Sequence, residues 1–333
     1  MPRFKMKTYR SADFKFYRIP DELEAALRAF AKWSDDHLLR EQAATTPTSP
    51  LYHYTGAAAL EGILRNEHLW FFAHSDQSDT EEFSYSLGLA LAELARVARG
   101  GDVLTGELCR CVRSLVDEND LTKTFGFFLF SLSQARDLES QWKQYGVGGT
   151  GFQIGFAPSL FLPNDPLSGH ADRNAVLGKV VYGDDASTAA HREIIEEAAR
   201  IYSNVGVANV GTILSDAVLY KRYVNAMAKE LIARQLIWRS LTSKRERFKS
   251  ESELRYVTLN RRQNFEGKTF IVKDSDGRER RYIKYPIALK VPGHITEILV
   301  GPNAPPDAEQ MVRRLLDRFG YRSVRVDRSN KKV

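Results

Sequence analysis

The sequence predicts an α+β protein with a mixed, split β-sheet, flanking helices and a helical insertion. Three observations lead to this prediction. The chain has 333 residues, and 43% of them are apolar, which is enough for a sizeable core. Short strand-like segments are separated by helical patterns of unequal length. The regular strand-helix-strand alternation of a parallel α/β fold is missing, which favours a mixed sheet.

The N-terminal part reads as an appendage to the main domain. A helical pattern covers "PDELEAALRAFAKWSDDHLLREQ", and "AATTPTSP" after it has linker composition. We therefore expect a helical extension and linker over residues 1–48 and one domain over residues 49–333.

The elements of the main domain follow from local patterning. Strands are predicted over 51–55, 68–73, 125–133, 151–156, 175–183, 253–260, 269–274, 280–291, 296–301 and 322–327. Helices are predicted over 56–66, 136–145, 185–204, 212–241 and 306–319, with two more across 79–119. The long helical patterns define the insertion, about 185–245. Asp276 and Gly277 supply a hairpin turn between two late strands.

Composition excludes several classes of protein. The first twenty residues lack the apolar core of a secretory signal, and no window reaches the roughly 18 apolar residues of a membrane span. We therefore expect a cytoplasmic protein with no membrane partner. Cys109 and Cys111 are the two cysteines, too few for a zinc site, and we interpret them as reduced packing residues.

The charge of the chain is modestly basic and uneven. Lys and Arg number 48 against 42 Asp and Glu, and the basic segments Lys244–Arg247, Arg261–Arg262 and Arg278–Arg281 all follow residue 240. This pattern suggests a nucleic acid as partner of the C-terminal half. A solvated basic surface without a partner explains the same charge.

Three adjacent polar residues, His53, Tyr54 and Thr55, end the first predicted strand. Buried polar groups need hydrogen-bond partners, and a ligand could be that partner. Strand alternation sends His53 and Thr55 to one face and Tyr54 to the other. The alternative is a core histidine bonded to the backbone, with Thr55 as the N-cap of the next helix.

The segment "HSDQSDTEEF" offers a second polar group. His74 and the carboxylates after it form a set that could bind a metal. Ser78 or Asp79, followed three residues later by Glu81 or Glu82, is also the pattern of a helix capping box. The capping box is the preferred interpretation, because an apolar periodic run follows at once.

A third segment is "FSLSQARDLESQWKQYGVGGTGFQIGF". Ser131 and Ser133 share one face of a strand, and Trp142 and Tyr145 share one face of a helix. The glycines do not form a P-loop, because no Gly-Lys-Ser/Thr closes the run, and no helix follows as dinucleotide binding would require. We expect them to permit a tight turn, or a close approach of backbone to a ligand.

The fourth segment, "FKSESELRYVTL", places Glu251, Glu253 and Arg255 at every second position. On an extended strand all three side chains point to one side. Two carboxylates beside a guanidinium would make a poor core and a good site. An exposed sheet face with a surface ion pair is the alternative.

Together these segments resemble the bacterial family DUF2971. The resemblance rests on "LYHYTGAAALEGILRNEHLWF", "SDTEEF", the serine and glycine segment, "ESELRYV" and the closing "ITEILVGPNAPPDAEQMVRRLLDRFGYRSVRVDRS". It spans about Leu51 to Ser329 in the right order.

The opening strand and helix also resemble those of ADP-ribosyltransferases, with His53, Thr55 and Glu253 as the matching positions. The resemblance implies a split sheet of that type and an enzyme that takes NAD as substrate and needs no metal. Catalytic roles fall on Glu253, Glu251 and His53. Contacts to NAD fall on His53, Tyr54, Thr55, Ser133, Tyr145 and Arg255, and Tyr85 and Tyr145 are the candidates for an aromatic ring that stacks on nicotinamide.

The chemistry of NAD cleavage agrees with these roles. Breaking the bond between nicotinamide and ribose creates oxocarbenium character, which a carboxylate such as Glu253 stabilises. Glu251 would orient or deprotonate the acceptor, and Arg255 would grip a pyrophosphate or hold the two glutamates. The implied biology is a bacterial toxin or anti-phage defence factor, with nucleic acid as the first acceptor to test and an antitoxin or defence protein as partner.

Two rival functions use the same residues. One is a metal-dependent nuclease or phosphodiesterase with His53, Asp79, Glu82 and Glu253 as its site. The other is a sensor that binds nucleotides or nucleic acid without turnover.

Overall fold

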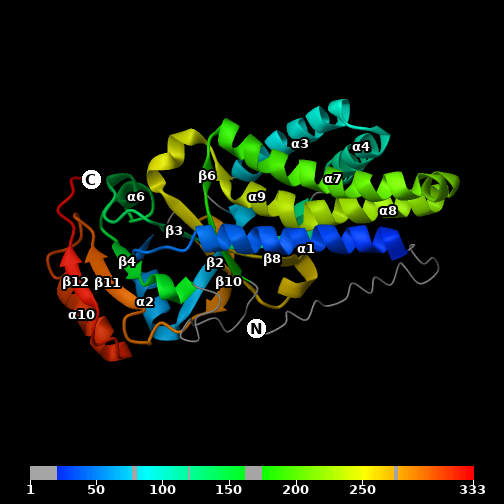
Figure 1. The fold of residues 1–333 in the computed structure, drawn as a ribbon. Helices are drawn as coiled ribbons and strands as arrows, with labels where there is room; N and C mark the ends of the chain where they lie inside the picture. Colours follow the sequence, from blue (N-terminus) through cyan, green and yellow to red (C-terminus); the bar gives the residue numbers. More distant parts are fainter. Residues whose placement is uncertain (1–20, 77–80, 119–120, 162–174, 274–276) are drawn as a thin grey trace. The chain divides into compact units, whose positions relative to one another are not determined.

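The computed structural model describes residues 21–76, 81–118, 121–161, 175–273 and 277–333. The protein is a mixed α+β protein with a mixed sheet (Figure 1). The chain divides into two compact units. The helical unit comprises the described residues of Met1–Asp36, Ala90–Glu118 and Ala190–Ile237, and the sheet unit comprises the described residues of His37–Leu89, Asn119–Ala189 and Trp238–Val333.

The strands of the main sheet are short, as their sequences predict. They are β1 Leu51–Thr55, β2 His68–Ala73, β3 Phe125–Ser133, β4 Phe152–Phe156, β5 Ala175–Lys179, β8 Glu253–Arg261, β9 Thr269–Lys273, β10 Glu279–Pro286, β11 Ile295–Val300 and β12 Arg325–Arg328. A separate parallel pair is formed by β6 Val181–Tyr182 and β7 Ser243–Lys244.

Helices make up most of the remainder. The α-helices are α1 Asp21–Ala44, α2 Ala57–Asn66, α3 Glu82–Gly100, α4 Val103–Glu118, α5 Leu121–Thr124, α6 Glu139–Gln144, α7 Asp184–Ser215, α8 Ala217–Glu230, α9 Ile237–Leu241 and α10 Ala308–Phe319. Shorter turns include η2 His74–Asp76, the π-helix η4 Leu231–Leu236 and the 3-10 helix η5 Glu246–Glu251.

The main sheet branches at β3. Along one path the strand order is β12-β11-β4-β1-β3-β2-β10-β9, and β8 pairs with both β3 and β5. β3 meets β8 along its whole length, from the pair Phe125 and Arg261 to the pair Ser133 and Glu253. On its other edge it meets β1 at one pair, Tyr52 with Ser133, and β2 at two pairs. The β11–β12 pairing is parallel and the other pairings are antiparallel, so the sheet is mixed.

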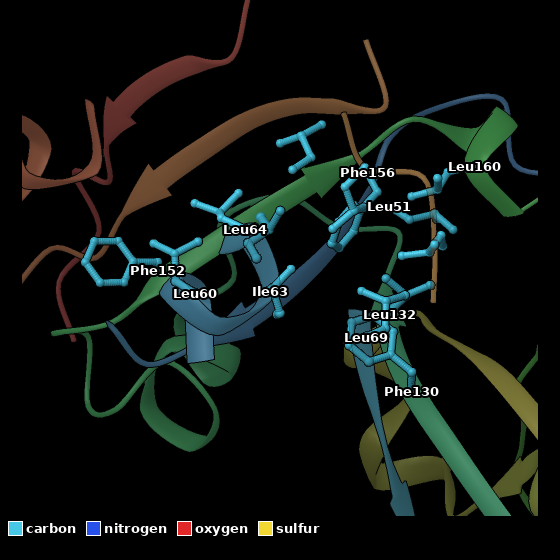
Figure 2. Packing of buried hydrophobic residues seen from close by; sticks show 14 of the residues in the cluster. Leu51, Leu60, Ile63, Leu64, Leu69, Phe130, Leu132, Phe152, Phe156 and Leu160 are labelled. Carbon is cyan, nitrogen blue, oxygen red and sulfur yellow. The ribbon is translucent and has the colours of Figure 1, made fainter. Parts of the chain in front are cut away.

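One face of the sheet, here called the core face, carries the hydrophobic core. Strand alternation explains it: in β2 every second residue is buried, and the residues between them are half-buried. Helices α2 and α10 add Leu60, Leu64 and Val312 to the same core. Figure 2 shows part of this packing, with Leu51, Phe130 and Phe156 among the labelled side chains. The opposite side of the sheet is called the second face.

The helical unit is held by packing and by buried polar contacts. Tyr202 and Tyr223 stack with their ring centroids 5.2 Å apart, joining α7 to α8. The amide of Gln235 donates to the Ser34 hydroxyl at 2.6 Å. The bond between Gln235 and Ser34 joins segments that are far apart in the sequence and belong to the same unit.

This division differs from the one expected from the sequence. The predicted extension over 1–48 contributes Asp21–Asp36 to the helical unit, and the predicted insertion shares that unit with residues 90–118. The reason is amphipathic packing: α4 lies against α8, and the Cys111 thiol donates to Asn225. The predicted strand over 175–183 also breaks, because β5 ends at Lys179 and β6 pairs elsewhere with β7.

Cys109 and Cys111 are free cysteines, the first buried and the second partly buried. Burial raises the pKa of the Cys109 thiol to about 11. Within the described residues, none of the helices combines the length and apolar character needed to cross a bilayer.

Candidate functional site

Five charged side chains meet on the second face of the sheet unit. This charge cluster consists of Glu82, Lys244, Glu251, Glu253 and Arg255. Each of the five is buried, and Glu251 and Glu253 are 5% and 6% exposed. Burying charge is costly unless it is paired and hydrogen-bonded, so the contacts within the cluster determine what it can do.

Arg255 is the centre of the charge cluster. Its Nε donates to Oε1 of Glu253 at 2.9 Å, and its Nη2 donates to Oε2 of the same carboxylate at 3.1 Å. Nη2 also donates to Oε2 of Glu82 at 2.6 Å, and Nη1 donates to the Leu241 carbonyl at 2.8 Å. The two bonds from Nε and Nη2 to Glu253 fix the plane of its carboxylate.

Lys244 bridges all three carboxylates. Its Nζ lies 2.7 Å from Oε2 of Glu251, 3.1 Å from Oε1 of Glu82 and 3.3 Å from Oε2 of Glu253. Two cations therefore face three carboxylates. The ammonium has three protons, so it can satisfy one oxygen of each.

The two glutamates converge through a turn. The sequence pattern predicts Glu251, Glu253 and Arg255 on one extended strand, but β8 begins at Glu253 and Glu251 ends the 3-10 helix η5. Between them Ser252 has φ of 46°, a left-handed conformation that non-glycine residues rarely adopt. Backbone of this kind tends to occur at functional sites, where the surrounding structure holds it.

The turn is fastened from both sides. The Ser133 hydroxyl donates to the carbonyl of Glu251 at 2.7 Å, and the Gln134 amide donates to the carbonyl of Ser252 at 3.0 Å. The amide of Glu253 donates to the Tyr182 hydroxyl at 2.7 Å. Ser133 thus contributes to the site by holding backbone, a different role from the NAD contact predicted for it.

The surroundings move the pKa values of the two glutamates in opposite directions. Burial raises the pKa of Glu253, but the charges of Arg255 and Lys244 outweigh it and lower the pKa to about 2. Burial raises the pKa of Glu251 above its usual range, and Lys244 opposes that rise only in part. Paired carboxylates that differ in this way are typical of acid-base sites.

His53 lies on the other face of the sheet from Glu253. Tyr52 pairs with Ser133, and Ser133 pairs with Glu253, so these three side chains share the second face. The next residue of β1 therefore points to the core face, where the His53 ring stacks on Phe130 with centroids 4.1 Å apart. A single ligand on one face cannot contact both His53 and Glu253 in this arrangement, contrary to the sequence-based expectation.

The imidazole of His53 has a partner in the backbone. Its Nδ1 lies 2.9 Å from the carbonyl of Ser131, and since a carbonyl only accepts, Nδ1 carries the proton. Burial lowers the pKa of His53 to about 4, with the Ser131 carbonyl opposing the change. The ring thus provides a hydrogen-bond partner for the Ser131 carbonyl of β3, at a position where β1 no longer pairs with β3. This agrees with the alternative of a core histidine bonded to the backbone.

Tyr54 and Thr55 also have places outside the charge cluster. The Tyr54 hydroxyl accepts from the Leu138 amide at 2.7 Å, and the Tyr54 ring packs edge-on against Trp142. Thr55 points to the core face by strand alternation and does not cap α2. Gly56 takes the N-cap position, because its carbonyl accepts the first helical bond, from the Leu60 amide.

Tyr145 and the glycine run lie at the end of α6. Tyr145 is 37% exposed and follows the last residue of that helix. A Cβ on Gly151 would stand 2.4 Å from the Thr55 carbonyl, and one on Gly301 would stand 2.2 Å from the Gly149 carbonyl. Close approach of neighbouring backbone therefore explains these glycines without a ligand.

The segment after β2 divides between two structural roles. Ser78 and Asp79 lie outside the described residues, so neither the capping box nor the Asp79 ligand of the nuclease hypothesis is placed. Asp76 accepts from the Arg281 amide at 2.6 Å and from its guanidinium, which ties η2 to β10. Glu82 belongs to the charge cluster.

No group of three or more His, Cys, Asp or Glu side chains within the described ranges is arranged to hold a metal ion. The three carboxylates of the charge cluster do come together, but Lys244 and Arg255 occupy the positions from which a cation would be bound. The described cluster therefore does not fit the metal site of the nuclease hypothesis.

Sequence reasoning missed two members of the site. By sequence Lys244 belongs to the basic segments that could follow a phosphate backbone, but in the structure it is buried and bound to three carboxylates. Tyr182 belongs to a predicted strand, and its hydroxyl accepts from the Glu253 amide. One available signal was the uncharged run Ser240–Ser243 directly before Lys244, which favours burial at this point of the chain and hence a partner for the charge of the lysine.

Comparison with known proteins gives one match. The model of a family described as "Protein of unknown function (DUF2971)" matches residues 141–256. Searches of the curated proteins and of the solved structures found no significant match. The matched segment runs from α6 to the middle of β8 and includes Lys244, Glu251, Glu253 and Arg255, so four of the five members of the charge cluster lie in the part of the chain that is similar to the family DUF2971.

Proposed function

We propose that the chain transfers ADP-ribose from NAD to an acceptor and that the charge cluster is its catalytic centre. The observation that carries the proposal is the pair Glu251 and Glu253, which share the Nζ of Lys244 while their pKa values move in opposite directions. Two carboxylates of unequal acidity are what cleavage of a glycosidic bond requires.

Glu253 is the electrostatic member of the pair. A pKa of about 2 keeps it ionised at neutral pH, and Arg255 holds its plane. The bond between ribose C1′ and the nicotinamide nitrogen breaks, its electron pair leaves with nicotinamide, and positive charge develops on the ribose. A fixed carboxylate near that charge, accepting from the ribose 2′-hydroxyl, lowers the barrier.

Glu251 is the proton acceptor. Its raised pKa brings it closer to neutral pH than an ordinary glutamate, which suits a general base. The acceptor's oxygen or nitrogen attacks C1′ and forms the new bond, and its proton passes to the Glu251 carboxylate. Nicotinamide and the ADP-ribosylated acceptor are the products, and no oxidant or metal enters the balance.

The remaining roles change from those expected from the sequence. Arg255 is a positioning residue, because its guanidinium already binds two carboxylates and the Leu241 carbonyl. His53 acts through β3, by binding the Ser131 carbonyl beside the strand's pair with β1. Ser131 joins the site, since its side chain helps to lower the pKa of Glu253.

Tyr85 is the preferred ring for stacking on nicotinamide. It follows Glu82 by one turn of α3, and the guanidinium of Arg245 lies over its ring at 4.9 Å. A ring that already carries a cation on its face suits the positively charged nicotinamide ring, which would replace Arg245 there. Tyr145, the other candidate, lies at the end of α6.

The proposal requires that NAD displaces part of the cover over the charge cluster. Glu251 and Glu253 are nearly inaccessible, and the groups that bind them from above are Lys244 of β7 and the Tyr182 hydroxyl of β6. Since β6 and β7 pair over only two residues and form a separate two-stranded sheet, moving them does not break a ladder of the main sheet.

Labelled NAD tests the proposal directly. The protein is incubated with NAD labelled in the adenylate part and with separate pools of RNA, DNA and protein, in the presence and absence of a chelator. Transfer of label, with release of nicotinamide and no effect of the chelator, supports it. Loss of activity in chelator would favour the nuclease class, and binding of NAD without any nicotinamide release would favour the sensor.

A further inference from the structure

Four aromatic rings lie side by side on the second face of β2, β9 and β10. This aromatic ledge consists of Trp70, Phe72, Phe270 and Tyr282. The register places them together, because Tyr282 pairs with Phe72 on one side and with Phe270 on the other. Trp70 stacks on Tyr282 with centroids 4.6 Å apart, and the rings of Phe270 and Tyr282 are 5.6 Å apart.

The ledge is accessible. Phe270 is 40% exposed, Trp70 and Phe72 are half-buried, and only Tyr282 is buried, beneath its neighbours. The intervening residues of β2 all enter the core. Large aromatic side chains that are contiguous and partly exposed on one sheet face commonly mark a binding surface.

Basic side chains stand among the rings. The ammonium of Lys284 lies 4.2 Å from the centroid of Phe270, and the guanidinium of Arg280 lies 4.2 Å from that of Phe72. Strand alternation assigns to this face the residues His68, Trp70, Phe72, Phe270, Val272, Arg280, Tyr282, Lys284 and Pro286. Within these three described strands the face carries no carboxylate.

We propose that the aromatic ledge binds single-stranded nucleic acid. Unpaired bases stack on exposed aromatic rings on a sheet, and interleaved lysine and arginine side chains hold the phosphates between them. The absence of carboxylates on this face of β2, β9 and β10, whose residues are all described, suits a polyanion. A duplex keeps its bases stacked inside and offers no such partner to the rings.

The ledge lies on the same face of the sheet as the charge cluster. Phe72 of β2 pairs with Leu129 of β3, and two residues further along β3 Ser131 pairs with Arg255. A strand of nucleic acid on the ledge would therefore be on the side from which Glu253 and Glu251 act. The binding proposal stands on the ledge alone and does not require that the charge cluster be catalytic.

Binding of fluorescent oligonucleotides of about 20 nucleotides tests the proposal, with single-stranded RNA, single-stranded DNA and duplex DNA as separate probes. Anisotropy should give tighter binding to a single strand than to the duplex. Phe270→Ser should weaken that binding on the order of tenfold, because the variant loses the stacking of one base on the Phe270 ring. Lys284→Gln should reduce the slope of log affinity against log salt by about 0.7, the value for one phosphate contact on a single strand.

Ile271 supplies the matched control. It neighbours Phe270 on the same strand, is 61% exposed and points to the other face, so Ile271→Ser should leave affinity unchanged. Circular dichroism and thermal unfolding establish that both variants fold. Equal binding by the parent and Phe270→Ser, an equal loss in Ile271→Ser, or a preference for the duplex would each overturn the proposal. Because no NAD is present, failure here leaves the transferase proposal untouched, and the reverse also holds.

Discussion

Lys244 and Glu251 form a buried ion pair with 2.7 Å between Nζ and Oε2. The lysine comes from β7 and the glutamate from the end of η5, so the pair closes the short segment between them onto the start of β8. Glu82 and Glu253 contact the same ammonium. A single lysine therefore compensates part of the negative charge of three buried carboxylates.

Lys244→Met should destabilise the protein strongly. Removing one partner of a buried pair leaves uncompensated charge, which typically costs about 3–5 kcal/mol. Lys249→Met is the control, since Lys249 forms an exposed pair with Glu246 at 2.9 Å and exposed pairs contribute about 0–1 kcal/mol. Denaturant unfolding gives both values, and similar small losses would show that the charge cluster is open to water.

Glu253→Gln should slow release of nicotinamide on the order of 10²-fold, because it removes the charge that faces the oxocarbenium and keeps the shape. Binding of NAD should persist. Glu297→Gln is a matched control: Glu297 is a buried carboxylate held by Arg136 at 2.9 Å and by Arg325, far from Glu253 in the strand order. If both variants lose activity in parallel with stability, Glu253 has a structural role only.

Glu251→Gln should separate two steps of the reaction. Its proposed partner is the acceptor, so transfer of ADP-ribose should fall more than cleavage of NAD. The comparison needs nicotinamide release and acceptor labelling measured in the same samples. An equal fall in both rates would assign Glu251 to the cleavage step or to the fold.

His53 should make stability depend on pH. Between pH about 6.5 and about 4 the unfolded chain binds a proton at this residue and the folded protein does not, because burial lowers the folded-state pKa to about 4. The free energy of unfolding should therefore fall as pH falls through that window. His53→Gln keeps a donor for the Ser131 carbonyl and should flatten this part of the profile relative to the parent. A profile identical to the parent's would mean that the ring is solvated.

Gly151→Ala should destabilise the protein by about 1–3 kcal/mol, since its Cβ would stand 2.4 Å from the Thr55 carbonyl and backbone cannot move aside cheaply. Gly88→Ala is the control. Gly88 lies in α3 with nothing within 4 Å of an added Cβ, so Gly88→Ala should raise the free energy of unfolding by about 0.5–1 kcal/mol. Equal effects in thermal unfolding would remove the packing explanation of the glycine run.

The sequence predicted the strands well because their signals are local. β2 and β3 begin and end at the predicted residues, since alternation and flanking turns act over a few positions. The branching at β3 and the joining of residues 90–118 to the long helices depend on contacts between distant segments. Local patterns carry little of that information.

The candidate site was predicted in part for the same reason. Glu251, Glu253 and Arg255 do converge, but through the left-handed Ser252, which no local rule indicated. Whether His53 and Glu253 lie on the same face of the sheet depends on the register of β1 against β3. A shift of one residue would move His53 to the face of Glu253. The role of Lys244 could not be predicted from its own segment, because its carboxylate partners come from other elements.

The single pair of Tyr52 with Ser133 is the only β1–β3 ladder contact among the described residues, and it bears on how the sheet opens. One part of the sheet consists of β1, β4, β11 and β12, and another of β3 with β8, and within each part the neighbouring strands pair over four or more residues. Cooperative unfolding of these two parts of the sheet therefore depends on the apolar core that they share, with little contribution from backbone hydrogen bonds. When a core residue such as Phe130 is truncated, the amide protons of the two parts should exchange with distinct opening free energies. The two parts would then unfold as separate cooperative units.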